Sequence, residues 1–213
     1  VKFCTNEEWE TSGSAYSLLC ADLSGESIIV SYADILYRPN VIEQLKQSNS
    51  DVTVVYDSHW KKRFVGRTEK DLSFAEKVVV SDGCLLGAGE GLHQEWANGE
   101  FIGLVCIQGP ALEYLRRLQT QQNTQVKKTT LSGLIEWLRL QGVSISAVDV
   151  MGDWAELNEQ KDIAHFILGT KAQTLDRLRR MVNKSIVLNQ SSFTVFDWKN
   201  NSQDILKNLQ NTF

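Results

Sequence analysis

At residues 27–37 the chain reads Ser27-Ile28-Ile29-Val30-Ser31-Tyr32-Ala33-Asp34-Ile35-Leu36-Tyr37, a near-continuous apolar run interrupted by one carboxylate. A run of this kind predicts a strand that is buried on both faces, as in parallel sheets. Ligands of open α/β sheets bind at the carboxyl ends of strands, and a carboxylate buried there is costly without a cation or hydrogen-bond donors. Asp34 is therefore the best candidate for a metal or phosphate-linked site. The alternative is a solvated Asp that caps the next helix.

Predicted helices and strands alternate after this stretch. Pro39 suits the first turn of a helix, in which Val41, Ile42 and Leu45 form an apolar stripe. Residues 51–56 form a second buried-type strand, so the order strand, helix, strand predicts a parallel crossover. Further strands are predicted at residues 76–80, 100–107 and 143–150, and further helices at residues 110–118, 131–140 and 159–168.

The composition excludes several classes of protein. The chain has 213 residues, which is enough for one large or two small domains. A formal net charge of −4 argues against a nucleic-acid or membrane-surface partner attracted by bulk charge. No apolar run reaches membrane-spanning length. The four cysteines are widely spaced and form no CxxC pair, which suits a reducing, cytoplasmic compartment.

A second group of oxygen ligands follows the predicted strand at residues 143–150. Glu156 and Asn158 are two positions apart, so they point to the same side of an extended segment. Magnesium commonly takes one or two carboxylates together with substrate phosphates. Asp34 with Glu156 and Asn158 is therefore a candidate Mg²⁺ site. The alternative for Asn158 is a helix cap alone.

Aromatic and charged residues follow the strand at residues 51–56. Asp57, Trp60 and Arg63 lie close together in the sequence and could hold a phosphorylated or quaternary-amine group. The alternative is the solvated start of an amphipathic helix. Glu100 opens a later strand and could bind a substrate hydroxyl or amine, or form a salt bridge.

Five short segments carry a resemblance to a known family. They are Tyr16-Ser17-Leu18, residues 31–37, Asp57 with Trp60 and Arg63, residues 99–104, and Trp154-Ala155-Glu156-Leu157-Asn158. In this order residues 1–168 resemble the nucleotidyltransferases that join a nucleoside triphosphate to a phosphorylated sugar or choline, most of all the phosphocholine cytidylyltransferase-like branch. The resemblance implies an α/β fold, a Rossmann-like three-layer sandwich with a mixed, mostly parallel sheet.

The resemblance also implies roles for individual residues. Asp34 matches the catalytic Asp that binds magnesium, and the segment from Glu156 to Asn158 matches the second metal position. Asn158 stands where relatives often carry Asp. The positions implied to bind substrate are Tyr16, Ser17, Asp57, Trp60, Arg63, Glu100 and Trp154.

One part of the family pattern has no counterpart in the sequence. The family opens with a strand and a Gly-rich loop bearing an Arg, followed by a Lys, which together hold the triphosphate. Val1-Lys2-Phe3-Cys4 is itself predicted to be a strand, and this start suggests that a first βα unit precedes Val1. A sheet without that strand would expose unpaired edges, so a homodimer is one expectation.

The C-terminal part resembles a different family. The segment Leu168-Gly169-Thr170-Lys171-Ala172-Gln173-Thr174-Leu175 is similar to the opening of ATP-grasp domains of the phosphoenolpyruvate synthase type. This similarity implies a place in a larger, multidomain chain. The predicted domains are residues 1–168, nucleotidyltransferase-like, and residues 169–213, a C-terminal extension that could begin a further domain.

The expected function is nucleotidyl transfer from a nucleoside triphosphate, with CTP preferred, to phosphocholine, a phosphonate or a sugar phosphate. Mg²⁺ held by Asp34 would bridge the phosphates, and pyrophosphate would leave. One alternative is a non-catalytic remnant or binding module of the same fold. Another is a metal-dependent glycosyltransferase, which would normally carry Asp-x-Asp where this chain has Tyr32-Ala33-Asp34.

Overall fold

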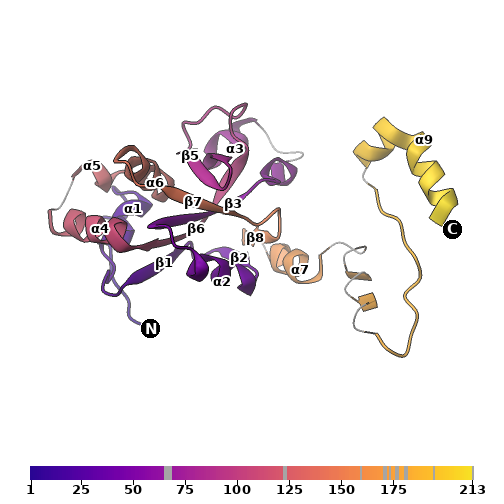
Figure 1. The fold of residues 1–213 in the computed structure, drawn as a ribbon, viewed down its shortest axis with the longest axis horizontal. Helices are drawn as coiled ribbons and strands as arrows, with labels where there is room; N and C mark the ends of the chain where they lie inside the picture. Colours follow the sequence, from indigo (N-terminus) through magenta and orange to yellow (C-terminus); the bar gives the residue numbers. More distant parts are fainter. Residues whose placement is uncertain are drawn as a thin grey trace. The chain divides into compact units, whose positions relative to one another are not determined.

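Strand β6 (Gly99–Gln108) connects most of the main sheet in the computed structural model of the chain (Figure 1). It pairs antiparallel with β1 (Ser27–Ser31), β3 (Val52–Asp57) and β4 (Lys77–Ser81). The sheet order is β1-β6-β3-β7-β5-β4, in which β5 is Cys84–Ala88 and β7 is Ile145–Asp149. A separate two-stranded sheet joins β2 (Ile35–Tyr37) to β8 (Trp154–Glu156).

The structure describes residues 1–64, 69–121, 124–158, 160–169, 172, 174–175, 178–179, 182–193 and 195–212. It divides the chain into two units, Val1–Glu156 and Leu157–Phe213. The main sheet and its covering helices belong to the first unit.

Side chains of β6 alternate between two buried layers. Phe101, Val105 and Ile107 face the core that contains α1 (Ser14–Leu19), α4 (Gly109–Gln121) and α6 (Leu131–Leu140). Ile102, Leu104 and Cys106 face the core that contains α2 (Pro39–Gln47) and residues of the two-stranded sheet. The first unit is thus an α/β sandwich of three layers around a mixed sheet, as the resemblance implied.

The stretch at residues 27–37 differs from its prediction. It forms two strands, β1 and β2, with Tyr32, Ala33 and Asp34 between them. β1 pairs only with β6 among the described strands, and Ile28 and Val30 pack on the core while Ile29 is 38% exposed. An edge strand with one buried face therefore explains the apolar run, and the predicted two-faced burial is wrong.

The prediction of a mostly parallel sheet is also wrong for the described strands, in which β3 and β7 form the one parallel pair. β1 and β3 do run in the same direction, because both are antiparallel to β6 between them. The segment β1–α2–β3 is therefore a crossover that leaves a gap of one strand. Sequence periodicity could not show that β6, from much later in the chain, fills this gap.

The remaining elements of the first unit connect these layers. Asp82 and Gly83 have φ of 51° and 72°, so the turn between β4 and β5 uses the left-handed conformations of a tight hairpin. The described part of the unit also contains short helices: a 3₁₀ helix at Trp60–Phe64, α3 (Glu69–Phe74) and α5 (Thr124–Lys127). Residues 1–6 contain no strand, so the predicted strand at Val1–Cys4 is wrong.

The second unit contains two longer helices, α7 (Gln160–Leu168) and α9 (Val195–Thr212), the latter kinked at Asn201. The structural division falls after Glu156. The predicted domain boundary after residue 168 stays a prediction. Thr170, Lys171 and Gln173 of the ATP-grasp-like segment lie outside the described residues. None of the helices in the described ranges is long and apolar enough to cross a membrane.

Candidate functional site

A cleft of about 350 Å³ opens in the first unit beside the junction of the main sheet and the two-stranded sheet. Four of the residues that the sequence singled out, Asp34, Glu100, Trp154 and Glu156, lie on its wall. They come from three segments that are far apart in the sequence. The complete wall is Ser14, Tyr32, Asp34, Ile35, Phe74, Glu76, Glu90, Glu100, Phe101, Ile102, Thr130, Trp154 and Glu156.

Asp34 and Glu156 lie close together on the wall of this cleft. In the antiparallel register of β2 and β8, Glu156 stands opposite Ile35, the residue after Asp34. Asp34 is exposed rather than buried at a strand end. Two neighbouring carboxylates offer the oxygen ligands that Mg²⁺ combines with substrate phosphates, so these residues suit that ion.

The role of Asn158, the third predicted metal ligand, stays a prediction. Asn158 belongs to the second unit, where its backbone N–H donates to Asp162 Oδ2 at 3.0 Å at the start of α7. Among the side chains that the structure describes, no three His, Cys, Asp or Glu residues converge as a metal cluster. Within the first unit, the candidate magnesium site consists of Asp34 and Glu156.

Three further carboxylates line the cleft. Glu76, Glu90 and Glu100 lie on its wall, and Lys77 is close to them, directly opposite Glu100 in the register of β4 and β6. Lys77 is 3% exposed and its Nζ donates to the carbonyl oxygens of Leu72, Ser73 and Ala75 at the end of α3, at 3.1–3.4 Å. Burial lowers the pKa of Lys77, which Glu90 and Glu100 partly restore.

Glu76 is held by hydroxyl groups from two distant elements. Tyr32 Oη donates to Glu76 Oε2 at 2.8 Å, and Ser132 Oγ of α6 donates to Glu76 Oε1 at 2.7 Å. Burial raises the pKa of Glu76 although both hydrogen bonds favour its charged form. Burial, with the nearby Glu76, also raises the pKa of Tyr32. This network fixes a carboxylate in the wall of the cleft.

Gly103 gives the Tyr32 ring its place beside β6. A Cβ at Gly103 would lie 2.1 Å from Tyr32 Cδ2, and Gly103 has a φ of +83°. The Tyr32 backbone N–H donates to the Gly103 carbonyl at 2.9 Å, and the ring meets Phe101 edge-on with centroids 6.2 Å apart. Because Gly103 has no side chain, it leaves the space beside β6 that the Tyr32 ring occupies in the wall of the cleft.

Asp57 supports the cleft from beneath rather than lining it. Its side chain is fully buried, and it accepts hydrogen bonds from Trp154 Nε1 at 2.9 Å and from the His59 backbone N–H at 2.8 Å. Asp57 therefore orients the indole of Trp154, which does line the cleft. A direct substrate contact, as predicted for Asp57, does not agree with this burial, because a polar residue after a strand can turn inward as well as outward.

Trp60 is a core residue in the structure. It is 1% exposed and packs with Phe64, Ala75 and Ala97, with its ring 5.9 Å from that of Phe64. The predicted role of Trp60 in binding substrate is therefore not supported by its position. The side chain of Arg63 lies outside the described residues.

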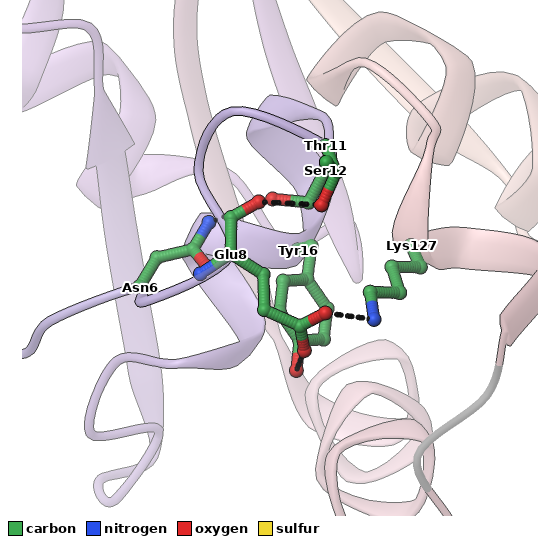
Figure 2. A network of polar contacts seen from close by, with 6 residues as sticks. All are labelled: Asn6, Glu8, Thr11, Ser12, Tyr16 and Lys127. Carbon is green, nitrogen blue, oxygen red and sulfur yellow. Dashed lines mark hydrogen bonds and ion pairs between the residues drawn. The ribbon is translucent and has the colours of Figure 1, made fainter.

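Tyr16 and Ser17 are on α1 but form other polar contacts, and Figure 2 shows those of Tyr16. Tyr16 Oη donates to Glu8 Oε1 at 3.3 Å, and Glu8 forms an ion pair with Lys127. Ser17 Oγ accepts a hydrogen bond from Asn6 Nδ2 at 2.9 Å. Neither residue lines the cleft, to which α1 contributes Ser14 instead.

Sequence reasoning missed Glu76, Glu90 and the Tyr32 hydroxyl. Glu76 stands immediately before β4, and Tyr32 lies two residues before Asp34, so proximity to predicted elements was the one available signal. Their convergence depends on the long-range register of β1, β4 and β6, which local patterns do not contain.

No protein-family model matches the chain. Among curated proteins, the chain is similar to the CTP:phosphoglutamine cytidylyltransferase of Campylobacter jejuni, with 21% identity over 176 residues, covering 76% of the chain and 70% of the relative. Its fold is similar to that of an inositol-1-phosphate CTP transferase from T. maritima, with a TM-score of 0.54, 16% identity, and coverage of 84% of the chain and 66% of that structure.

A putative glucose-1-phosphate thymidylyltransferase from Bacillus anthracis has a TM-score of 0.53 and 13% identity, with coverage of 83% of the chain and 65% of that structure. The chain thus spans slightly less than two thirds of the length of both solved structures. It shares with these nucleotidyltransferases an α/β fold with a mixed sheet.

Proposed function

We propose that the chain forms the acceptor-binding part of a nucleotidyltransferase that joins CTP to a phosphorylated acceptor and releases pyrophosphate. The observation that carries this proposal is the cleft in which Asp34, Glu100, Trp154 and Glu156 lie on a common wall. Similarity to a CTP-dependent cytidylyltransferase over 76% of the chain supports the same activity.

In the proposed reaction, an oxygen of the acceptor phosphate attacks the α-phosphorus of CTP. A new P–O bond forms, the bond from the α-phosphorus to the bridging oxygen breaks, and pyrophosphate leaves with that oxygen. The attacking phosphate is already ionised, so the protein mainly has to position it and to stabilise charge. Asp34 and Glu156 would hold Mg²⁺, which when bound would neutralise phosphate charge beside these two carboxylates.

The charge of the cleft favours one class of acceptor. Five carboxylates lie on its wall, Asp34, Glu76, Glu90, Glu100 and Glu156. The neighbouring Lys77 directs its ammonium group to three backbone carbonyls. An acceptor whose only charged group is a phosphate would be repelled, whereas a positively charged nitrogen would be attracted to the carboxylates and aromatic rings.

We therefore propose an acceptor that carries a phosphate at one end and a cationic nitrogen at the other. The phosphate would lie toward Asp34 and Glu156, and the nitrogen toward Glu76, Glu90 and Glu100. Phosphocholine has this arrangement. A phosphorylated glutamine, the acceptor in the name of the curated relative, also carries a cationic nitrogen, although its α-carboxylate lies beside it. The charge of the cleft favours these acceptors over a sugar phosphate.

The test is pyrophosphate release by the natural protein that contains this chain, with CTP, other nucleoside triphosphates and a panel of phosphorylated acceptors. Asp34→Asn is expected to lower kcat/KM by about 100-fold or more, because a ligand of the metal loses its charge. Asp82→Asn is the matched control, since Asp82 lies in the exposed turn between β4 and β5 and Asn tolerates its φ of 51°.

Two results would contradict the proposal. One is the absence of pyrophosphate release with every triphosphate and acceptor in the panel. The other is an Asp34→Asn variant that turns over as fast as the Asp82→Asn control. Binding of acceptors without turnover would instead favour a binding module of the same fold.

A further inference from the structure

A second pocket of the first unit, about 570 Å³ in volume, is lined by two thiols from separate segments. Cys4 belongs to the N-terminal segment, and Cys20 follows the last residue of α1. Both are free thiols; Cys4 is exposed and Cys20 is half-buried. The cleft described above contains neither residue, so this pocket is a separate feature of the fold.

Two side-chain contacts hold the N-terminal segment alongside α1 and the residues that follow it. Lys2 Nζ forms an ion pair with Asp22 Oδ2 at 2.9 Å, and Asn6 Nδ2 donates to Ser17 Oγ at 2.9 Å. Lys2 precedes Asn6 while its partner Asp22 follows Ser17, so the two segments run in opposite directions. Cys4 lies between Lys2 and Asn6, and Cys20 lies between Ser17 and Asp22, so the two contacts bracket both thiols on the wall of one pocket.

Hydrogen bonds fix the backbone at Cys20 and at its two neighbours. The Cys20 backbone N–H donates to the Tyr16 carbonyl at 3.0 Å at the end of α1. Gln119 of α4 donates through Nε2 to the carbonyls of Leu19 and Ala21, the two neighbours of Cys20, at 2.6 Å and 2.9 Å. Cys4 is exposed, and residues 1–6 form no helix or strand. Cys4 can therefore approach Cys20 without disturbing either kind of element.

The two thiols also affect each other electrostatically. Burial raises the pKa of Cys20, and the charges of Glu8 and Cys4 raise it further. Cys20 therefore stays mainly protonated, while the exposed Cys4 is the thiol that an oxidant in solution reaches first.

We propose that Cys4 and Cys20 form a reversible intramolecular disulfide that fastens the N-terminal segment to the end of α1 when the chain meets a peroxide. The Cys4 thiol would be oxidised by hydrogen peroxide to a sulfenic acid with release of water. Cys20 would then attack the sulfenic sulfur, the S–O bond would break, and a second water would leave. One peroxide is thus reduced for one disulfide formed, and a dithiol reductant restores both thiols.

The experiment treats the full 213-residue chain with hydrogen peroxide, blocks the remaining thiols, and digests it without reduction. A Glu-specific protease separates the two cysteines, because Glu7, Glu8 and Glu10 lie between them. The expected result is a cross-linked pair of peptides that contain Cys4 and Cys20, lighter by two hydrogen atoms than their sum. Dithiothreitol should convert this pair back to separate peptides.

The variants separate this disulfide from unspecific oxidation. Cys4→Ser and Cys20→Ser should each abolish the cross-link, whereas Cys84→Ser, which removes an exposed thiol outside the pocket, should leave it intact. The oxidised chain should also melt at a higher temperature than the reduced chain, and Cys4→Ser should abolish that shift. Independent alkylation of Cys4 and Cys20 after oxidation, or a cross-link to Cys84 or to a second chain, would overturn the proposal.

Discussion

The hydrogen bond from Trp154 to Asp57 joins a buried carboxylate to a side chain that lines the cleft. Trp154→Phe would keep most of the apolar ring but remove this donor, so Asp57 would lose one of its two hydrogen bonds while buried. We expect the free energy of unfolding to fall by about 1–3 kcal/mol, measured by urea denaturation.

Trp96→Phe is the control for this change, because Trp96 is 74% exposed. It should alter the free energy of unfolding by less than about 0.5 kcal/mol. Equal losses in both variants would show that the Asp57 contact does not stabilise the fold.

Glu100 tests the proposed charge preference of the cleft. The natural protein should bind phosphocholine at least about 10-fold more tightly than its uncharged carbon isostere, in which a tert-butyl group replaces the trimethylammonium group. Glu100→Gln should reduce this ratio, because it removes one carboxylate from the wall that the nitrogen faces. Calorimetric titration without CTP measures the ratio independently of turnover.

Glu113→Gln is the control, since Glu113 lies on an exposed part of α4 outside the cleft. Equal affinity for phosphocholine and its isostere would contradict the charge preference while leaving nucleotidyl transfer open. Loss of turnover with an unchanged ratio of the two affinities would contradict nucleotidyl transfer and leave the charge preference open.

We expect the buried carboxyl group of Glu76 to make the free energy of unfolding depend on pH. Because burial raises its pKa in the folded state, the folded chain binds this proton more tightly than the unfolded chain does. Glu76 therefore lowers the free energy of unfolding as pH rises from the ordinary glutamate pKa through the raised one. Glu76→Gln removes this contribution, so its stability relative to the natural residue should increase with pH across that window.

Urea midpoints across this range, with Glu26→Gln as an exposed control, would measure the difference. Carboxylates remote from Glu76 titrate equally in both proteins, so the difference between the two curves reports Glu76 together with its charge interaction with Glu90. A difference that stays constant with pH would contradict the prediction.

At the scale of single elements, β6 depends on the glycine that accommodates Tyr32. Gly103→Ala would place a Cβ 2.1 Å from the Tyr32 ring and force a side chain into a φ of +83°. The free energy of unfolding should fall by about 2 kcal/mol or more, with a lower melting temperature.

Gly91→Ala is the matched control, because a Cβ there meets no atom within 4 Å. Its melting temperature should change little. Equal melting temperatures for the two variants would show that the strand and the ring can move apart without cost.

Several elements could be predicted from the sequence because their signals are local. Pro39 begins α2, the leucine spacing of α4 and α6 marks their buried faces, and the Asp82-Gly83 pair marks a hairpin. The edge position of β1 could not be predicted, since a short apolar run has the same pattern in a central strand and in an edge strand.

The candidate site was predictable in part for the same reason. Asp34, Glu100 and Glu156 were found from their places beside predicted strands, and Trp154 through a segment that resembles a known family; the cleft contains all four. Asp57 and Trp60 come from a similar segment but turn inward, and no local pattern distinguishes these two outcomes. Glu76 joins the wall through Tyr32 and Ser132, 44 and 56 residues away in the sequence.

For the whole molecule, the division after Glu156 predicts that the first unit folds alone. Every buried apolar side chain identified in the described part of the chain lies at or before Trp154. A chain shortened to residues 1–156 should therefore unfold cooperatively, with a melting temperature within about 4 °C of the full chain.

A second shortened chain, residues 1–168, adds α7 and tests the sequence-based boundary. If α7 is part of the first domain, this chain should be clearly more stable than residues 1–156. Loss of cooperative unfolding in both would contradict an independent first unit.

The position of β6 also determines the order in which the protein can be made. Its three partners, β1, β3 and β4, all precede it in the chain, so none of these pairings can form before β6 itself has been synthesised. Until then the nascent chain must carry these apolar strand segments without their common partner. High contact order of this kind slows folding, and it makes the emerging segment a natural client for chaperones during translation.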